Sequence, residues 1–143
     1  MNEAEEASSV LRAFFQAMNA WEKESKLLYK RAEKGEFDGE EWGRRIATSL
    51  EALYREFCES GAAPARLQRG NLRYCSPPEY NADAEKILSV EVDGNVATIT
   101  TLPTHDPRQF KKIYQLVKSP PGWRLRDNRR EIKKDGRIVP WDL

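Results

Sequence analysis

The spacing of the apolar residues changes near residue 62, and this change most constrains the fold. Before it, apolar side chains recur at spacings of three, four and seven residues, which is typical of amphipathic helices. After it, prolines and glycines interrupt the chain, and runs of β-branched residues alternate with turn signals, as in antiparallel strands. Helices followed by strands indicate an α+β fold in which the helices pack on one face of an antiparallel sheet.

Two helices are expected before this change. The first would begin at Asn2, with Glu5 completing a capping box, and would run for about eight turns to a stop at Gly35. The second would begin at Asp38, whose carboxylate can accept from the free N–H groups of the first turn, and end at a Gly61 C-cap. Their apolar stripes are Ala7, Leu11, Phe14, Met18, Trp21 and Leu28, and Trp42, Ile46, Leu50, Leu53 and Phe57.

The rest of the chain predicts four or five strands. The turn Asp93-Gly94-Asn95 separates two runs rich in β-branched residues, and it is a strong hairpin signal because Gly and Asn accept a positive φ. Pro120-Pro121-Gly122 and Asp135-Gly136 mark two later turns. We therefore expect strands at 87–92, 96–102, 109–118 and 123–132, and a short last piece at 138–141.

The net charge is a cancellation between two unlike parts of the chain. The 143 residues sum to +1, but residues 1–60 carry 9 Lys and Arg against 13 Asp and Glu, whereas residues 61–143 carry 15 against 10. The helical part is thus acidic and the strand part basic. A net charge near zero argues against a general nucleic-acid binder.

Length and the N-terminal sequence bound the class of protein. A chain of this length suggests one domain over residues 1–143, which can bury a core without a disulfide or metal. No apolar run approaches the ~20 residues of a membrane helix, and the acidic start is unlike a signal peptide. We therefore expect a cytoplasmic protein that does not enter a membrane. Its two cysteines, Cys58 and Cys75, would be reduced and would act as small apolar residues.

Two stretches, together with the element order, resemble a known family. One is Tyr-Cys-Ser-Pro-Pro-Glu-Tyr-Asn at 74–81, which continues into Glu-Lys-Ile-Leu-Ser-Val at 85–90. The other is Lys-Ile-Tyr-Gln-Leu-Val at 112–117, followed by Gly-Trp-Arg-Leu at 122–125. They resemble bacterial immunity proteins of the nuclear-transport-factor-like fold, which are encoded beside polymorphic toxins and serve in interbacterial competition. The resemblance implies a cone-like fold, in which a strongly curved sheet wraps the long first helix. It also implies a protein that binds and neutralises a cognate toxin domain encoded by a neighbouring gene.

Candidate catalytic and metal-binding residues are few. His105 lies beside Asp106 between two prolines, which favours an exposed connection without a catalytic role. One His and two cysteines seventeen residues apart do not have the spacing of a zinc site. We therefore expect no enzyme activity, no cofactor and no metal. The alternative is a small-molecule binder, or an isomerase- or dehydratase-like enzyme, that uses Asp83, Tyr114 and Asp127 inside the cone.

A basic strip near the C-terminus is the predicted toxin-binding surface. Arg124, Arg126 and Arg130 alternate along one expected strand and would share a face. Residues 108–143 carry 11 Lys and Arg against 4 Asp and Glu, which suits an acidic protein partner better than nucleic acid. Tyr80 and Trp141 would be exposed anchors or would plug the ends of the cone. The predicted binding residues are Glu79, Tyr80, Arg124, Arg126, Arg130 and Trp141, and a homodimer through the open sheet face is the third alternative.

Overall fold

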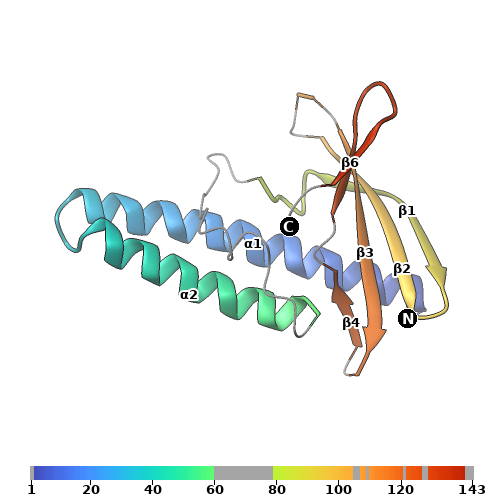
Figure 1. Ribbon diagram of the computed structural model, residues 1–143, viewed down its shortest axis with the longest axis horizontal. Helices are drawn as coiled ribbons and strands as arrows, with labels where there is room; N and C mark the ends of the chain where they lie inside the picture. The colour runs from blue at the N-terminus through green and yellow to red at the C-terminus, as the bar shows by residue number, and fades with distance from the viewer. Residues whose placement is uncertain are drawn as a thin grey trace.

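The computed structural model describes residues 2–59, 79–104, 107–108, 110–120, 122–126 and 129–140. These residues form two helices, α1 (Glu3–Glu33) and α2 (Gly39–Phe57), and six strands. The strands are β1 (Glu85–Asp93), β2 (Val96–Pro103), β3 (Lys111–Ser119), β4 (Gly122–Leu125), β5 (Arg130–Ile132) and β6 (Ile138–Pro140). The helices form an antiparallel pair, and the sheet lies across the end that holds the start of α1 and the end of α2 (Figure 1). The predicted α+β class is confirmed.

Both helices begin where the sequence predicts. The side chain of Asn2 accepts a hydrogen bond from the Glu5 N–H at 2.8 Å, and the side chain of Asp38 accepts one from the Glu41 N–H at 2.8 Å. These caps satisfy N–H groups that have no partner inside the helix. At the other end of α1, Gly35 has a φ of +85°, a conformation that glycine adopts without strain. In the described part of the chain, neither helix is long and apolar enough to cross a membrane.

The predicted end of the second helix is wrong. α2 ends at Phe57, and Cys58 takes an extended conformation in place of the predicted cap at Gly61, which lies outside the described residues. Cys58 forms an isolated parallel bridge with Leu125 of β4, and the Glu59 N–H donates to the Leu125 carbonyl at 2.9 Å. The helix therefore stops because its next residues pair with the edge of the sheet.

The predicted long strand at 123–132 is divided into β4 and β5. All pairings in the sheet are antiparallel in the order β1-β2-β3-β5-β6, and β4 pairs with β3 beside β5. Leu116 of β3 pairs with Leu125, and Ile113 pairs with Arg130. The chain thus takes five residue steps from Leu125 to Arg130 where β3 takes three, so two residues are extra. A regular ladder cannot hold them, and the strand breaks there.

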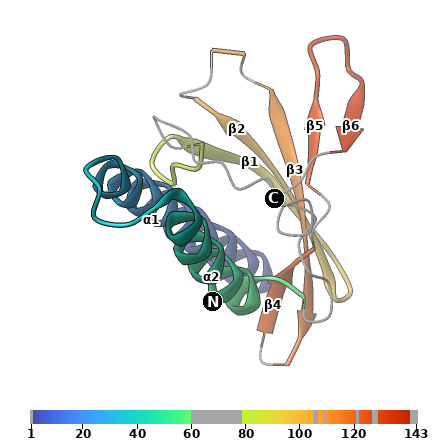
Figure 2. The same cartoon turned by 60° about the vertical axis from the view of Figure 1, so that its left-hand side comes forward.

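The core lies between α1, the end of α2 and the inner face of the sheet, which fans across one side of the helix pair (Figure 2). Phe14 is fully buried at its centre. Its ring centroid lies 6.4 Å from that of Tyr54, 5.9 Å from that of Phe57 and 5.5 Å from that of Tyr80. These contacts join both helices to the segment before β1, so a few large aromatic rings fill the space. Sheet residues in this core are Ala97, Ile99, Tyr114, Leu116, Trp123 and Leu125.

Candidate functional site

Charged side chains are buried together between the segment before β1 and the inner face of β3 and β5. Arg129 is 1% exposed and donates to the Tyr80 hydroxyl at 2.9 Å and to Glu79 Oε1 at 3.1 Å. Lys112 Nζ lies 3.8 Å from the same Glu79 oxygen. Two cations that burial has removed from water therefore share one carboxylate.

α1 holds the backbone of Tyr80 in place. The Asn19 side-chain amide donates to the Tyr80 carbonyl at 2.7 Å, and the Tyr80 N–H donates to a Glu22 carboxylate oxygen at 3.3 Å. The Tyr80 ring is 2% exposed and contacts the rings of Phe14 and Phe15. Tyr80 is therefore a core residue and is not the exposed anchor that was one of its two predicted roles.

Burial shifts the ionisation of this cluster. It raises the pKa of the Tyr80 hydroxyl well above its ordinary value, against the opposing charge of Arg129. It raises the pKa of Tyr114 in the same way. It lowers the pKa of Lys112, and the charge of Arg129 acts in the same direction while Glu79 opposes both. The two hydroxyls consequently stay neutral at ordinary pH.

Two further buried carboxylates have protein partners. Glu85 accepts a hydrogen bond from the Thr101 hydroxyl at 2.7 Å, and Glu131 accepts one from Lys133 Nζ at 3.2 Å. Buried polar groups that bond to one another in this way form a structural network. Glu85 and Glu131 therefore stabilise the sheet.

The opposite side of the sheet, the outer face, carries the predicted arginines. On β3 the side chains of Tyr114 and Leu116 are buried toward the helices, so the residues between them lie on the outer face. The pairing register places Arg124 beside Val117 and Arg130 beside Ile113. The outer face includes Val96, Thr98, Thr100, Lys111, Ile113, Gln115, Val117, Ile132 and Ile138, with Arg124, Arg126 and Arg130 along its β4–β5 side and Ser89, Glu91 and Asp93 on β1.

The three arginines differ in what they bind. Arg124 donates to the Cys58 carbonyl at 2.9 Å and also to the Arg55 carbonyl, so it caps the end of α2. Arg126 Nε lies 3.8 Å from a Glu59 carboxylate oxygen. The side chain of Arg130 has no hydrogen bond or ion pair with any described residue, and its Nε is buried without a partner there. Arg130 is thus the predicted cation that has no role inside the described part of the protein.

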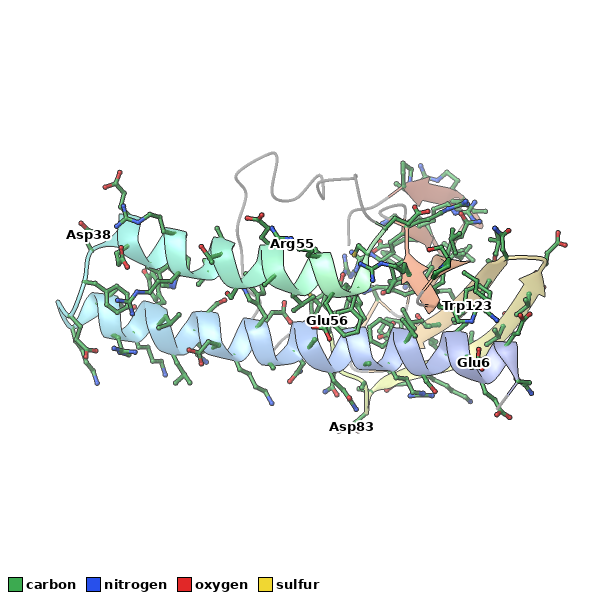
Figure 3. The ribbon with its side chains drawn as sticks, turned by 90° about the horizontal axis from the view of Figure 1, so that it is seen from below. Glu6, Asp38, Arg55, Glu56, Asp83 and Trp123 are labelled. Carbon is green, nitrogen blue, oxygen red and sulfur yellow. The ribbon has the colours of Figure 1, made fainter. Side chains whose placement is uncertain are left out.

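The candidates for the enzyme alternative are not gathered in the interior. Asp83 is exposed in the turn before β1 (Figure 3), whereas Tyr114 is buried in the core. Cys58 is buried, as expected of a small apolar residue. Within the described ranges, no group of His, Cys, Asp and Glu residues could hold a metal ion. Trp141, His105, Asp106, Asp127 and Cys75 lie outside the described residues.

Sequence reasoning missed the residue that organises the interior. The inward positions of the predicted last strand are odd-numbered, as Trp123 and Leu125 are buried, and the same alternation places Arg129 and Glu131 inward. Two charged residues at inward positions of a strand indicate a buried polar network. The carboxylate that compensates the buried charge of Arg129 belongs to Glu79, which lies fifty residues earlier and so gives no local signal.

The helix pair and the fanned antiparallel sheet define a protein of the NTF2-like fold. The chain belongs to the family described as NTF2 fold immunity proteins, whose family model matches residues 6–140. The comparisons with curated proteins and with solved structures gave no match.

Proposed function

We propose that this protein binds and neutralises a cognate bacterial toxin by covering the toxin's active or substrate-binding surface. The observation that carries the proposal is membership of the immunity-protein family over nearly the whole chain. The toxin domain is encoded by a neighbouring gene of a polymorphic toxin system, and the two proteins meet in the cytoplasm. The protein acts by binding alone, without catalysis, cofactor or nucleic acid.

The outer face of the sheet is the proposed contact surface. A paired sheet is already ordered before binding, so association costs little conformational entropy. Arg130 supplies a cation that no described residue neutralises, while Arg124 and Arg126 line the same side. Glu79 and Tyr80 lie on the inner side of the sheet, where they bind Arg129 and so support the contact surface from behind. Trp141 is the remaining residue predicted to contact the toxin. The partner surface would be acidic, which favours rapid encounter.

Co-expression with the neighbouring toxin tests the proposal. We expect the protein to restore growth of cells that make the toxin and to co-purify with a catalytically inactive form of it. Arg130→Glu should weaken binding by about tenfold or more. Arg12→Glu is the matched control, because Arg12 is exposed on α1 and is not part of the outer face. Absence of both rescue and binding by the wild-type protein would refute the proposed function.

The oligomeric state separates toxin binding from self-association. The same outer face could instead join two copies of the chain, because open sheet faces with β-branched residues also suit a symmetric interface. Sedimentation of the protein alone and of the toxin complex distinguishes the two uses. We expect the toxin to cover the outer face in the complex. Any homodimer that forms through this face should therefore dissociate when toxin is added.

A further inference from the structure

The β5–β6 hairpin forms one end of the sheet and lies away from the helix pair (Figure 1, Figure 2). Pairing across three strands places Lys111 of β3 beside Ile132 of β5, and Ile132 beside Ile138 of β6. Because directly paired residues point to the same side, these three share the outer face. Ile138 is 55% exposed.

The cations near this end divide into two groups. Lys133 lies 4.4 Å from the ring centroid of Phe110 and also bonds Glu131, and Arg108 lies 5.2 Å from the same ring. Arg137 bonds Asp135 at 2.6 Å. In contrast, the side chains of Lys111, Arg130 and Lys134 have no hydrogen bond, ion pair or ring contact with any described residue. We name these three cations, together with Ile132 and Ile138, the cationic tip.

The local charge is large for a protein with a net charge of +1. The described residues of 107–112 and 131–138 hold six Lys and Arg against two Asp and Glu, a local excess of +4. Both of these carboxylates bond to neighbouring cations within the hairpin. Lys112 is in addition paired with Glu79, so an excess of +3 remains among the described residues, and an acidic partner would meet this positive field first.

The centre of the tip favours a protein partner over nucleic acid. Two isoleucines surrounded by cations match an interface with an apolar core and a charged rim. A phosphate backbone would leave Ile138 without an apolar contact. Binding of single-stranded nucleic acid would need an aromatic face for base stacking, whereas the ring of Phe110 is already in contact with Arg108 and Lys133.

We infer that the cationic tip is the docking end of the outer face, and that it takes an apolar side chain of the toxin flanked by carboxylates. This inference rests on the proposed function and adds the chemistry of the partner's surface. The lysines would govern the encounter, because long-range attraction acts mainly on association rates. The isoleucines would govern the lifetime of the complex, because buried apolar contacts act mainly on dissociation.

The test measures binding kinetics with the catalytically inactive toxin domain encoded beside the gene, at low and at high salt. Lys111→Glu with Lys134→Glu should lower the association rate constant at low salt by about tenfold or more. Ile138→Ser should raise the dissociation rate constant by about fivefold with little change in association. Arg12→Glu with Lys23→Glu changes the charge equally on exposed positions of α1 and should change both rates less than about twofold.

The outcomes separate this inference from the proposed function. If the wild-type protein binds the toxin and the cationic-tip variants bind equally well, the inference fails and the proposed function stands. If the wild-type protein neither binds nor rescues, both fail. Binding of an RNA or DNA oligonucleotide, or self-association, that is lost in the lysine variants while toxin binding remains would also overturn the inference. Circular dichroism and thermal unfolding of each variant establish that the fold is retained.

Discussion

Trp21 and Trp42 each donate an indole N–H to a backbone carbonyl on the other's helix. Trp21 Nε1 lies 2.9 Å from the Ile46 carbonyl of α2, and Trp42 Nε1 lies 3.0 Å from the Ser25 carbonyl of α1. A buried indole N–H without a partner is costly, and here each finds one on the opposite helix. The two bonds run in opposite directions. They therefore restrict both the shift of one helix along the other and the rotation of each helix about its axis.

Replacing these tryptophans should weaken the helix pair unequally. Trp21→Phe removes one hydrogen bond and part of a ring that is only 4% exposed, so we expect a loss of about 2 kcal/mol of unfolding free energy. Trp42→Phe should cost about 1 kcal/mol, since Trp42 is only partly buried. Urea unfolding followed by circular dichroism measures both. A larger loss for Trp42→Phe would contradict the assignment of Trp21 as the more deeply buried member.

The buried ion pair should show coupling between its members. Arg129→Met leaves Glu79 and the Tyr80 hydroxyl without their donor, and we expect a loss of about 3 kcal/mol. Glu79→Gln should cost at least as much, because it leaves the buried charges of Arg129 and Lys112 without their carboxylate. The double variant should be more stable than the sum of the single losses by roughly 1–2 kcal/mol. Strictly additive losses would show that the pair does not interact.

Stability should fall in strongly alkaline solution. The raised pKa values of Tyr80 and Tyr114 mean that the folded protein keeps protons that the unfolded chain loses above its ordinary pKa of 10.0. This stabilisation is complete below pH 10 and is lost as the pH rises through the folded pKa. Lys112 acts oppositely, because its lowered pKa lets stability rise until the unfolded value of 10.5 is passed.

We therefore expect the unfolding free energy to decline above about pH 10.5, and Tyr80→Phe to make that decline shallower. Urea unfolding across this range provides the free energies, and the ultraviolet absorbance of tyrosinate reports the ionisation. An equal slope in the wild-type protein and Tyr80→Phe would mean that the Tyr80 hydroxyl does not hold its proton more firmly in the folded state.

Arg124 and Arg130 should separate stability from binding. Arg124→Ala removes the donor to two carbonyls at the end of α2 and should cost about 1–2 kcal/mol of unfolding free energy. Arg130→Ala should change stability by less than about 0.5 kcal/mol, because no described residue loses a partner. Toxin affinity should show the reverse order. Thermal unfolding and calorimetric titration of both variants decide the matter, and equal stability losses would speak against the capping role.

The elements that depend on local sequence were predictable. Asn2 and Asp38 begin their helices because each side chain bonds an N–H three residues later, which the sequence displays directly. The hairpin between β1 and β2 likewise turns at Gly94, whose φ is +60°. Such features need only neighbouring residues, so a single sequence reveals them.

The features that were missed depend on contacts far along the chain. α2 ends early because Cys58 pairs with Leu125, and the last strand breaks because two residues exceed the register with β3. Arg129 is buried because Glu79 and Tyr80 bind it. For the candidate site, alternation correctly grouped Arg124 with Arg130, but only tertiary contacts show that one of them caps a helix and the other does not.

The pairing of the end of α2 with β4 has a consequence for synthesis on the ribosome. The helix pair emerges first, yet its Cys58 and Arg55 carbonyls receive Arg124 only after more than sixty further residues are made. β3 must also be present before β4 can take its place beside it. The helical half therefore waits in an incompletely capped form, and the closure of the molecule is timed by the arrival of its last strands. A toxin synthesised nearby would meet a competent partner only once β3 and β4 have been translated.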